Sequence, residues 1–202
     1  MNRNYQKELD ALIEKNQHSG ITPKLMLHAC CACCLSYVLE YLSEYFHIYI
    51  LYSNPNITEE DEYNYRFDEV KRLVSLMKVK NKAQIVECEY TPKKYLEAVA
   101  GLENEPERGA RCSICFNLRL EETARMAEKY ECDYFATTLT ISPLKNASII
   151  NSIGERVSET VGIPYLPSDF KKKNGFKRSI ELSKEYDLYR QDYCGCVFSK
   201  RK

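Results

Sequence analysis

Apolar and polar positions alternate along the chain in two different rhythms. A brief apolar run at 25–27 and short runs at 47–52, 83–88 and 133–139 predict buried strands, and the run at 47–52 is rich in β-branched and aromatic residues. Between them, apolar residues recur with helical spacing, which predicts amphipathic helices at 5–15, 35–46, 58–77, 95–100, 118–130 and 150–161. Beyond Pro164 the periodicity weakens, through a basic loop and a short tyrosine-rich helix that lead to the last cysteines.

Strands separated by helices predict an α/β fold with a mostly parallel sheet and right-handed crossovers. We expect a single α/β domain over 1–202, with a core at about 24–165 and a C-terminal extension at about 166–202 that carries a basic loop and cysteines. Sites in such sheets form at the carboxyl ends of strands. His28 and the first run of cysteines follow the first strand directly, where a nucleotide-binding fold would place its phosphate loop.

Composition narrows the class of protein. Hydrophobic residues make up 44% of the 202 positions, enough for a packed core, so disorder is not expected. Because 29 basic residues balance 29 acidic ones, global charge gives no argument for nucleic-acid binding. The polar start of the chain does not resemble a signal peptide, and no apolar run is long enough to span a membrane. We therefore expect a cytoplasmic protein with no membrane partner.

Ten cysteines in such a chain predict metal binding or thiol chemistry rather than disulfides, because the cytosol keeps thiols reduced. Most of them fall in three short motifs, HACCACC at 28–34, CSIC at 112–115 and CGC at 194–196. A loop at a helix N-terminus brings the first set together, and the helix dipole favours thiolates there. The second pair can grip a metal from a turn, and Gly195 gives the third pair access to positive φ.

The number of clustered thiols exceeds the need of one ion. Four thiolates suffice for zinc or for a [4Fe–4S] cluster, so six to eight suggest a cluster with a second metal or with reactive thiols. A structural zinc site is the main alternative. Cys88 and Cys132 lie in or beside predicted strands and are interpreted as small buried hydrophobes. His28 is expected either to orient or ligate the metal or to make a structural hydrogen bond.

Several longer motifs extend this pattern along the chain. They are LHACCACC, NPN after the second strand, CSIC followed by NLRLEETA, TTLTISPLKN, DFKKKNGFKRS and LYRQDYCGCVFS. In this order they resemble QueH, the cobalamin-independent epoxyqueuosine reductase family, over about residues 24–199. Cys33 departs from the pattern, since the family has proline there, and is therefore not expected to be a ligand.

The resemblance implies a specific reaction and cofactor. QueH removes the epoxide oxygen of epoxyqueuosine at the tRNA wobble position, the last step of queuosine synthesis. The resemblance also implies a [4Fe–4S] cluster, an additional mononuclear iron, an external low-potential electron donor, and a fold related to the PP-loop type. The matching positions for cluster ligands are Cys30, Cys31, Cys112, Cys115, Cys194 and Cys196, and Cys34 joins them as a metal ligand. The lone iron would polarise the epoxide oxygen while the cluster supplies electrons.

The remaining candidates are not cysteines. Asp192 and Tyr193 adjoin Cys194 and are either proton donors or partners in structural hydrogen bonds. A basic loop around Asn174 predicts RNA contact, with Phe170 or Phe176 stacking on a base, although a solvated loop has the same composition. The predicted RNA-binding residues are Lys145, Lys171, Lys172, Lys173, Lys177 and Arg178, and a basic tail follows at Lys200, Arg201 and Lys202. The arginines Arg66, Arg119 and Arg190 are expected to contact RNA or to pair with carboxylates.

Two other functions compete with the reductase. One is an ATP-dependent tRNA-thiolation enzyme of the PP-loop type. Two observations argue against it: no SGGxDS-like loop follows the first strand, and glycine totals only 7. The other is a non-catalytic zinc or iron–sulfur module in RNA binding. Turnover with ATP would favour the first, and metal without turnover the second.

Overall fold

The computed structural model describes residues 3–200, and its centre is a four-stranded parallel sheet in the order β3-β2-β1-β4. The predicted α/β class and parallel sheet are confirmed. The strands are β1 (Lys24–His28), β2 (His47–Leu51), β3 (Ala83–Val86) and β4 (Tyr134–Thr137).

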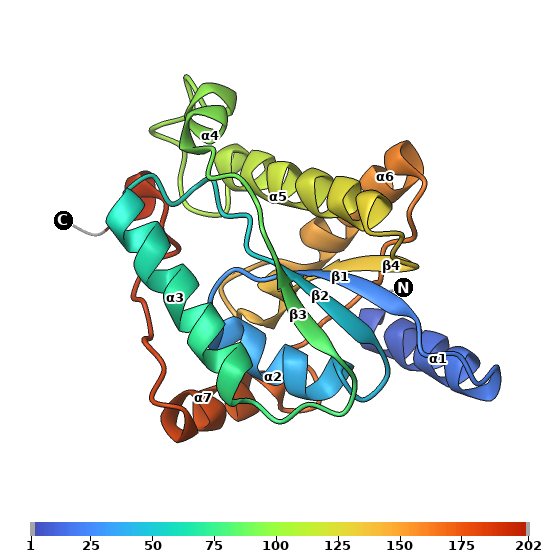
Figure 1. The fold of residues 1–202 in the computed structure, drawn as a ribbon. Helices are drawn as coiled ribbons and strands as arrows, with labels where there is room; N and C mark the ends of the chain where they lie inside the picture. The colour runs from blue at the N-terminus through green and yellow to red at the C-terminus, as the bar shows by residue number, and fades with distance from the viewer. Residues whose placement is uncertain (1–2, 201–202) are drawn as a thin grey trace.

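Helices cover both faces of this sheet, with α5 and α6 above it, α2 and α7 below it and α3 to its left in Figure 1. The helices are α1 (Tyr5–His18), α2 (Ala32–Leu42), α3 (Glu60–Leu76), α4 (Pro92–Ala98), α5 (Ala110–Lys129), α6 (Ala147–Val161) and α7 (Gly175–Glu185). Two short 3-10 turns follow β4 and precede the C-terminus, η1 (Thr138–Ile141) and η2 (Val197–Ser199). In the described part of the chain, none of these helices is long and apolar enough to cross a membrane.

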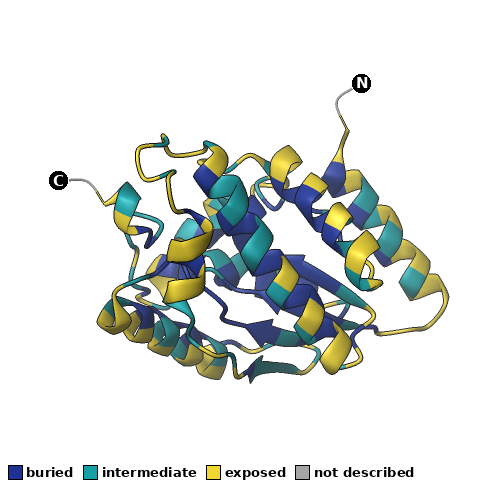
Figure 2. Cartoon of the chain, turned by 90° about the horizontal axis from the view of Figure 1, so that it is seen from above, coloured by how far each residue is buried: buried dark blue, intermediate teal, exposed yellow. Residues whose placement is uncertain are grey.

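The two faces of β1 explain its continuous apolar sequence. Leu25 and Leu27 pack on the side of α2 and α3, whereas Met26 packs on the side of α5 and α6. Because successive strand residues point to opposite faces, a strand covered on both sides must be apolar throughout. Figure 2 shows the buried strands beneath helices whose outer faces are exposed.

Two predicted elements were wrong, and each lies at or directly before a cysteine motif. The helix predicted at 118–130 begins at Ala110, so the CSIC motif lies inside α5 and not in a turn before it. The tyrosine-rich stretch after Glu185 is irregular chain, and the helix of this region lies earlier, at α7. Elsewhere the predictions erred only at element ends. Gly162, with φ +87°, ends α6 as expected.

The fold brings the ends of β1 and β4 together. His28 is paired with Thr137 across the sheet, and the strand order reverses between these two strands. Open parallel sheets bind ligands at such switch points, outside the carboxyl ends of the strands. Cys30 and Thr138 occupy this edge. Of the basic tail, Arg201 and Lys202 lie outside the described residues.

Candidate metal centre

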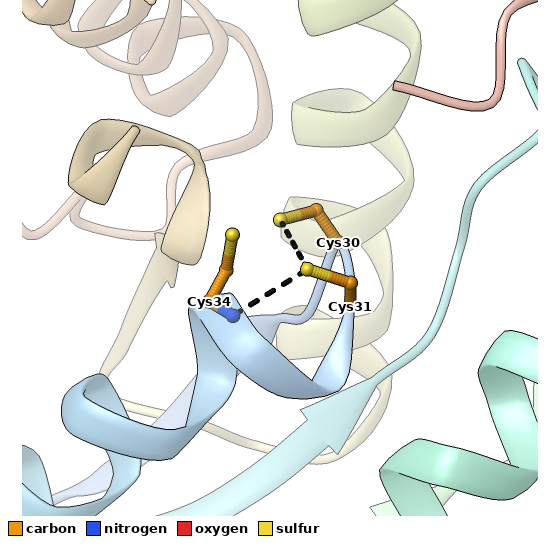
Figure 3. Close-up of side chains that lie close together, drawn as sticks. All are labelled: Cys30, Cys31 and Cys34. Carbon is orange, nitrogen blue, oxygen red and sulfur yellow. Dashed lines mark hydrogen bonds between the residues drawn. The ribbon is translucent and has the colours of Figure 1, made fainter. Parts of the chain in front are cut away.

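Three of the predicted ligands form what we call the first thiol group, Cys30, Cys31 and Cys34. Their sulfur atoms lie within 4.8 Å of one another, and the Sγ atoms of Cys30 and Cys31 are 3.9 Å apart. Figure 3 shows all three side chains at the turn from β1 into α2, with their sulfurs on the same side of the chain. A metal with bonds of about 2.3 Å to tetrahedral thiolates holds them about 3.8 Å apart, so this spacing suits one ion.

The start of α2 explains this convergence. Cys31 is the N-cap residue, and its sulfur accepts a hydrogen bond from the backbone N–H of Cys34 at 3.4 Å. A thiolate here takes the place of the usual oxygen cap and meets the positive end of the helix dipole. Cys33 lines the cavity beside Cys34 but lies outside this group, since its sulfur donates to the carbonyl oxygen of Tyr189 at 3.1 Å.

Cys30 is the thiol of this group best prepared to be a thiolate. The Thr138 hydroxyl donates to its sulfur at 3.3 Å, and the Cys30 N–H donates to that hydroxyl at 3.1 Å. Contacts with Cys31 and Cys34 hold the pKa of Cys30 well below its usual value. The contact with Cys30 raises the pKa of Cys31 to about 12, so the group shares its protons unequally.

The other four predicted ligands form the second thiol group, Cys112, Cys115, Cys194 and Cys196. They line a single cavity, although within residues 3–200 only the first thiol group has three ligand atoms inside 4.8 Å. Cys112 and Cys115 lie in the first two turns of α5, and a spacing of three places both on one face of the helix. The sulfur of Cys112 accepts a hydrogen bond from the Arg108 N–H at 3.2 Å.

The C-terminal pair of this group turns around Gly195, whose φ of +93° is the positive value expected. Hydroxyl groups lie 3.0 Å from each sulfur, Ser199 Oγ from Cys194 and Tyr95 Oη from Cys196. Hydrogen bonds from Cys196 and Ser199 lower the pKa of Cys194 to about 4. The second thiol group thus also contains one thiol prepared for metal binding.

Helix α3 holds the C-terminal segment in place. Arg72 donates to the carbonyl oxygens of Tyr186 and Asp187 at 2.9 and 2.8 Å, and the Tyr189 N–H donates to Glu69 at 3.0 Å. Further along, the buried Arg66 lies over the ring of Tyr193 at 4.9 Å. These contacts replace the regular secondary structure that the segment lacks.

Lys145 lies where the two thiol groups meet. It lines the cavity of the second thiol group and also a neighbouring cavity that contains Cys31 and Cys34; Cys194 lines both. Burial alone would lower the pKa of Lys145, but the thiols of Cys30, Cys34 and Cys194 raise it. The side chain therefore keeps its proton beside the sulfurs.

The predicted proton donors differ in position. Tyr193 lines the cavity beside Cys34, and burial raises its pKa. Asp192 is exposed and lines none of the cavities found among the described residues. The structure therefore brings Tyr193, but not Asp192, to the thiols.

The predicted RNA-binding residues fall into two sets. Lys171, Lys173 and Arg178 are ion-paired within the protein, with Asp169, Asp10 and Glu40 at 2.6, 2.7 and 2.7 Å. Lys172 and Lys177 are exposed, and no ion pair forms on them within residues 3–200. Phe170 is fully buried and cannot stack on a base, whereas Phe176 is half-buried and lines the cavity beside Cys34.

Two polar features near the thiols were only weakly signalled by the sequence. The ring of His28 is buried between Thr137 and the Ser53 carbonyl, at 2.9 and 3.1 Å, so both nitrogens are already engaged. Burial lowers the pKa of His28 to about 3, which keeps the ring neutral. Arg119 is buried too, and it donates to the side-chain oxygens of Asn54 and Asn56 rather than to RNA or a carboxylate.

The donor set fits a thiolate-bound metal centre. All ten cysteines are free thiols, and six of the seven predicted ligands line two cavities that share Lys145, with Cys30 beside Cys31 and Cys34. Soft thiolate ligands select zinc or iron–sulfur clusters, and the helix N-termini and cationic side chains offset their negative charge.

Comparisons with known proteins give a consistent result. A family model described as "Epoxyqueuosine reductase QueH" matches residues 25–202. A protein of that name from Streptococcus pyogenes is 43% identical over 98% of this chain and 78% of its own length. One from Staphylococcus epidermidis is also 43% identical, over 98% of this chain and 85% of its own. One from Thermotoga maritima is 33% identical over 87% of this chain and 89% of its own.

Proposed function

The chain belongs to the epoxyqueuosine reductase family QueH, and on that premise we propose that it removes the epoxide oxygen of epoxyqueuosine in tRNA. The conversion takes up two electrons and two protons, breaks both carbon–oxygen bonds, and yields an alkene and water. An external low-potential donor must supply the electrons. A tRNA substrate agrees with the cytoplasmic location that the sequence predicts.

We propose that the two thiol groups divide the iron between them. The first thiol group, with sulfurs 3.9 Å apart, would hold the mononuclear iron. The second thiol group would hold the [4Fe–4S] cluster, because a cube with one thiolate on each iron needs sulfurs spaced more widely than around one ion. When bound, this centre supplies the electrons and a Lewis acid for the epoxide oxygen.

The cavity beside the first thiol group is the proposed site of the modified nucleoside. Phe176 and Tyr193 line it, and Arg190 on its wall is fixed by a hydrogen bond to Ser183 at 3.0 Å. An aromatic side chain can stack on an unpaired base. Lys145 reaches the same cavity, where its ammonium group can donate a hydrogen bond to the epoxide oxygen and pass a proton to it.

Lys172 and Lys177 are the basic side chains best placed to meet phosphates, since their charges are not used inside the described structure. Lys171, Lys173 and Arg178 would have to give up ion pairs first. We therefore propose that RNA contact depends more on the former two than on the latter three. Removing a phosphate contact should weaken binding and lower its dependence on salt.

One observation carries this proposal: six of the seven ligand positions named from sequence line two cavities joined at Lys145 and Cys194, and the seventh, Cys30, lies 3.9 Å from Cys31. The test is single-turnover conversion of epoxyqueuosine tRNA by the anaerobically reconstituted protein with a chemical reductant. Lys145→Gln should keep its iron and lose most of its turnover, whereas Lys184→Gln, an exposed lysine on α7, should match the wild type. Unchanged turnover in Lys145→Gln would remove Lys145 from the reaction.

The competing functions give different outcomes in the same assay. ATP-dependent modification of tRNA without conversion of epoxyqueuosine would favour the thiolation enzyme. A zinc-only protein without turnover would favour the non-catalytic module. The family match supports the reductase over both.

A further inference from the structure

Three segments that are far apart in the sequence carry the thiols, and one buried polar cluster touches all three. We call it the amide–arginine hub, and it consists of Asn54, Asn56 and Arg119. All three side chains are at most 3% exposed. Asn54 and Asn56 are the two asparagines of the NPN motif after β2, for which the proposed reaction itself gives no role.

The hub contacts each thiol-bearing segment by a different bond. The Asn54 amide donates to the carbonyl oxygen of Ala29 at 2.9 Å, directly before Cys30. The Asn56 amide donates to the carbonyl oxygen of Cys194 at 3.0 Å. Arg119 lies one turn after Cys115 on α5, and it donates to the side-chain oxygens of both asparagines. Through the hub, each thiol-bearing segment is therefore linked to the other two.

The hub carries a buried positive charge. Within residues 3–200 no carboxylate lies within 4.0 Å of the Arg119 guanidinium, and its buried Nε has no hydrogen-bond partner. A buried cation is costly unless an opposite charge compensates it. By contrast, the buried Arg66 has Glu62 as its partner. Arg119 lines the cavity of the second thiol group, so thiolates at that cavity can supply the compensating negative charge.

We propose that Arg119, fixed by Asn54 and Asn56, is a built-in positive charge that, together with Lys145, balances the thiolate-bound metal centre, and that it holds the three segments in register. This inference rests on the proposed function only in assuming that the thiols bind metal. Arg119 is thus a positioning residue and not a group that touches the substrate. Without it, thiolates would gather with less compensation, so metal should bind more weakly and a bound cluster should be reduced at a lower potential.

The first experiment uses the full-length, metal-free protein and Co²⁺ as the probe, titrated anaerobically and followed by thiolate-to-cobalt absorption. Arg119→Gln should bind Co²⁺ at least about tenfold more weakly than the wild type, as for other partners that support ligands. Arg119→Lys, which keeps the charge, should lie between them. The matched control is Arg125→Gln on the same helix, where the side chain is 56% exposed and pairs with Glu122. Equal Co²⁺ affinity in Arg119→Gln and the wild type would overturn the proposal.

A second pair of variants separates charge from position and remains informative if Arg119 variants fail to fold. Asn56→Ala and Asn56→Asp both remove the bond to the Cys194 carbonyl, but only the aspartate neutralises Arg119. Asn56→Asp should therefore bind Co²⁺ more weakly than Asn56→Ala, and its reconstituted cluster should be reduced at a lower potential. Equal values for the two variants would overturn the charge role. If the wild type binds Co²⁺ but never converts tRNA, the proposed function fails while these comparisons still decide the role of the hub.

Discussion

The two thiol groups differ in how much of the protein is needed to build them. The first lies within five consecutive residues at the turn from β1 into α2, closed by one helix cap. The second joins the start of α5 to the C-terminal segment, which has no regular structure between α7 and η2 and depends on α3 for its position. A locally built site should tolerate distant changes, whereas an assembled site should fail with any of its supports.

The change expected to separate them most is Gly195→Ala. An added Cβ would lie 2.5 Å from Ile57 and would be held at φ +93°, so the turn between Cys194 and Cys196 must shift. We expect the iron content to fall from about five to about one per chain, because only the first thiol group would survive. Iron analysis after anaerobic reconstitution measures this.

The matched control is Gly101→Ala. Gly101 has φ +82° but nothing within 4 Å of an added Cβ, so the backbone strain is similar without the clash. It should keep its iron. Full iron content in Gly195→Ala would show that the C-terminal turn is not part of the centre.

A smaller effect is expected from removing a hydroxyl group beside either thiol group. Thr138→Val removes a donor to Cys30, and Tyr95→Phe removes the hydroxyl beside Cys196. Each should weaken metal binding about tenfold in its own group and leave the other unchanged. Competition with a chelator, with the mononuclear iron and the cluster followed separately by spectroscopy, tests this. Equal weakening of both groups by either variant would mean that they form one inseparable unit.

The sequence predicted the locally built site better than the assembled one. The run after β1 could be placed at a strand end and helix start, because hydrophobic periodicity marks both elements. The start of α5 carries no such mark, since its buried face includes the charged residues Arg111 and Arg119, which break the apolar spacing. The C-terminal segment is held by arginines and carbonyls from distant elements, and no local pattern reveals such contacts.

The same reasoning explains the other errors. Phe170 and Arg178 looked available to RNA, but one is in the core and the other is paired with Glu40. Burial and ion pairing are properties of the folded chain and not of the motif. Likewise Asn54, Asn56 and Arg119 are ordinary polar residues in the sequence and become a hub only when three segments meet.

A moderate effect is expected from Arg72→Ala. Its two hydrogen bonds to the carbonyls of Tyr186 and Asp187 help to hold the C-terminal segment, but the side chain is 38% exposed and its ion pair with Glu69 is screened. We expect a loss of about 1–2 kcal/mol in the free energy of unfolding and faster cluster release. Denaturant titration and the decay of cluster absorption measure the two, with the neighbouring exposed Lys71→Ala as the control. Cluster release unchanged from the wild type would argue against docking by α3.

The smallest effect is expected from Cys33→Ala. Its thiol donates to the Tyr189 carbonyl and stays out of the first thiol group, so the variant should keep its full iron content. Loss of the buried sulfur should cost about 1 kcal/mol or less of stability. A fall in iron content comparable with that of Cys34→Ala would instead make Cys33 a ligand.

The most direct test of the central claim, that seven thiols hold an iron centre for epoxide reduction, is metal analysis with an absorption spectrum of the anaerobically purified protein. The account predicts about four to five irons per chain and a broad absorption band at about 400 nm from thiolate-bound iron. One zinc per chain and no such band, even after anaerobic reconstitution with iron and sulfide, would contradict it.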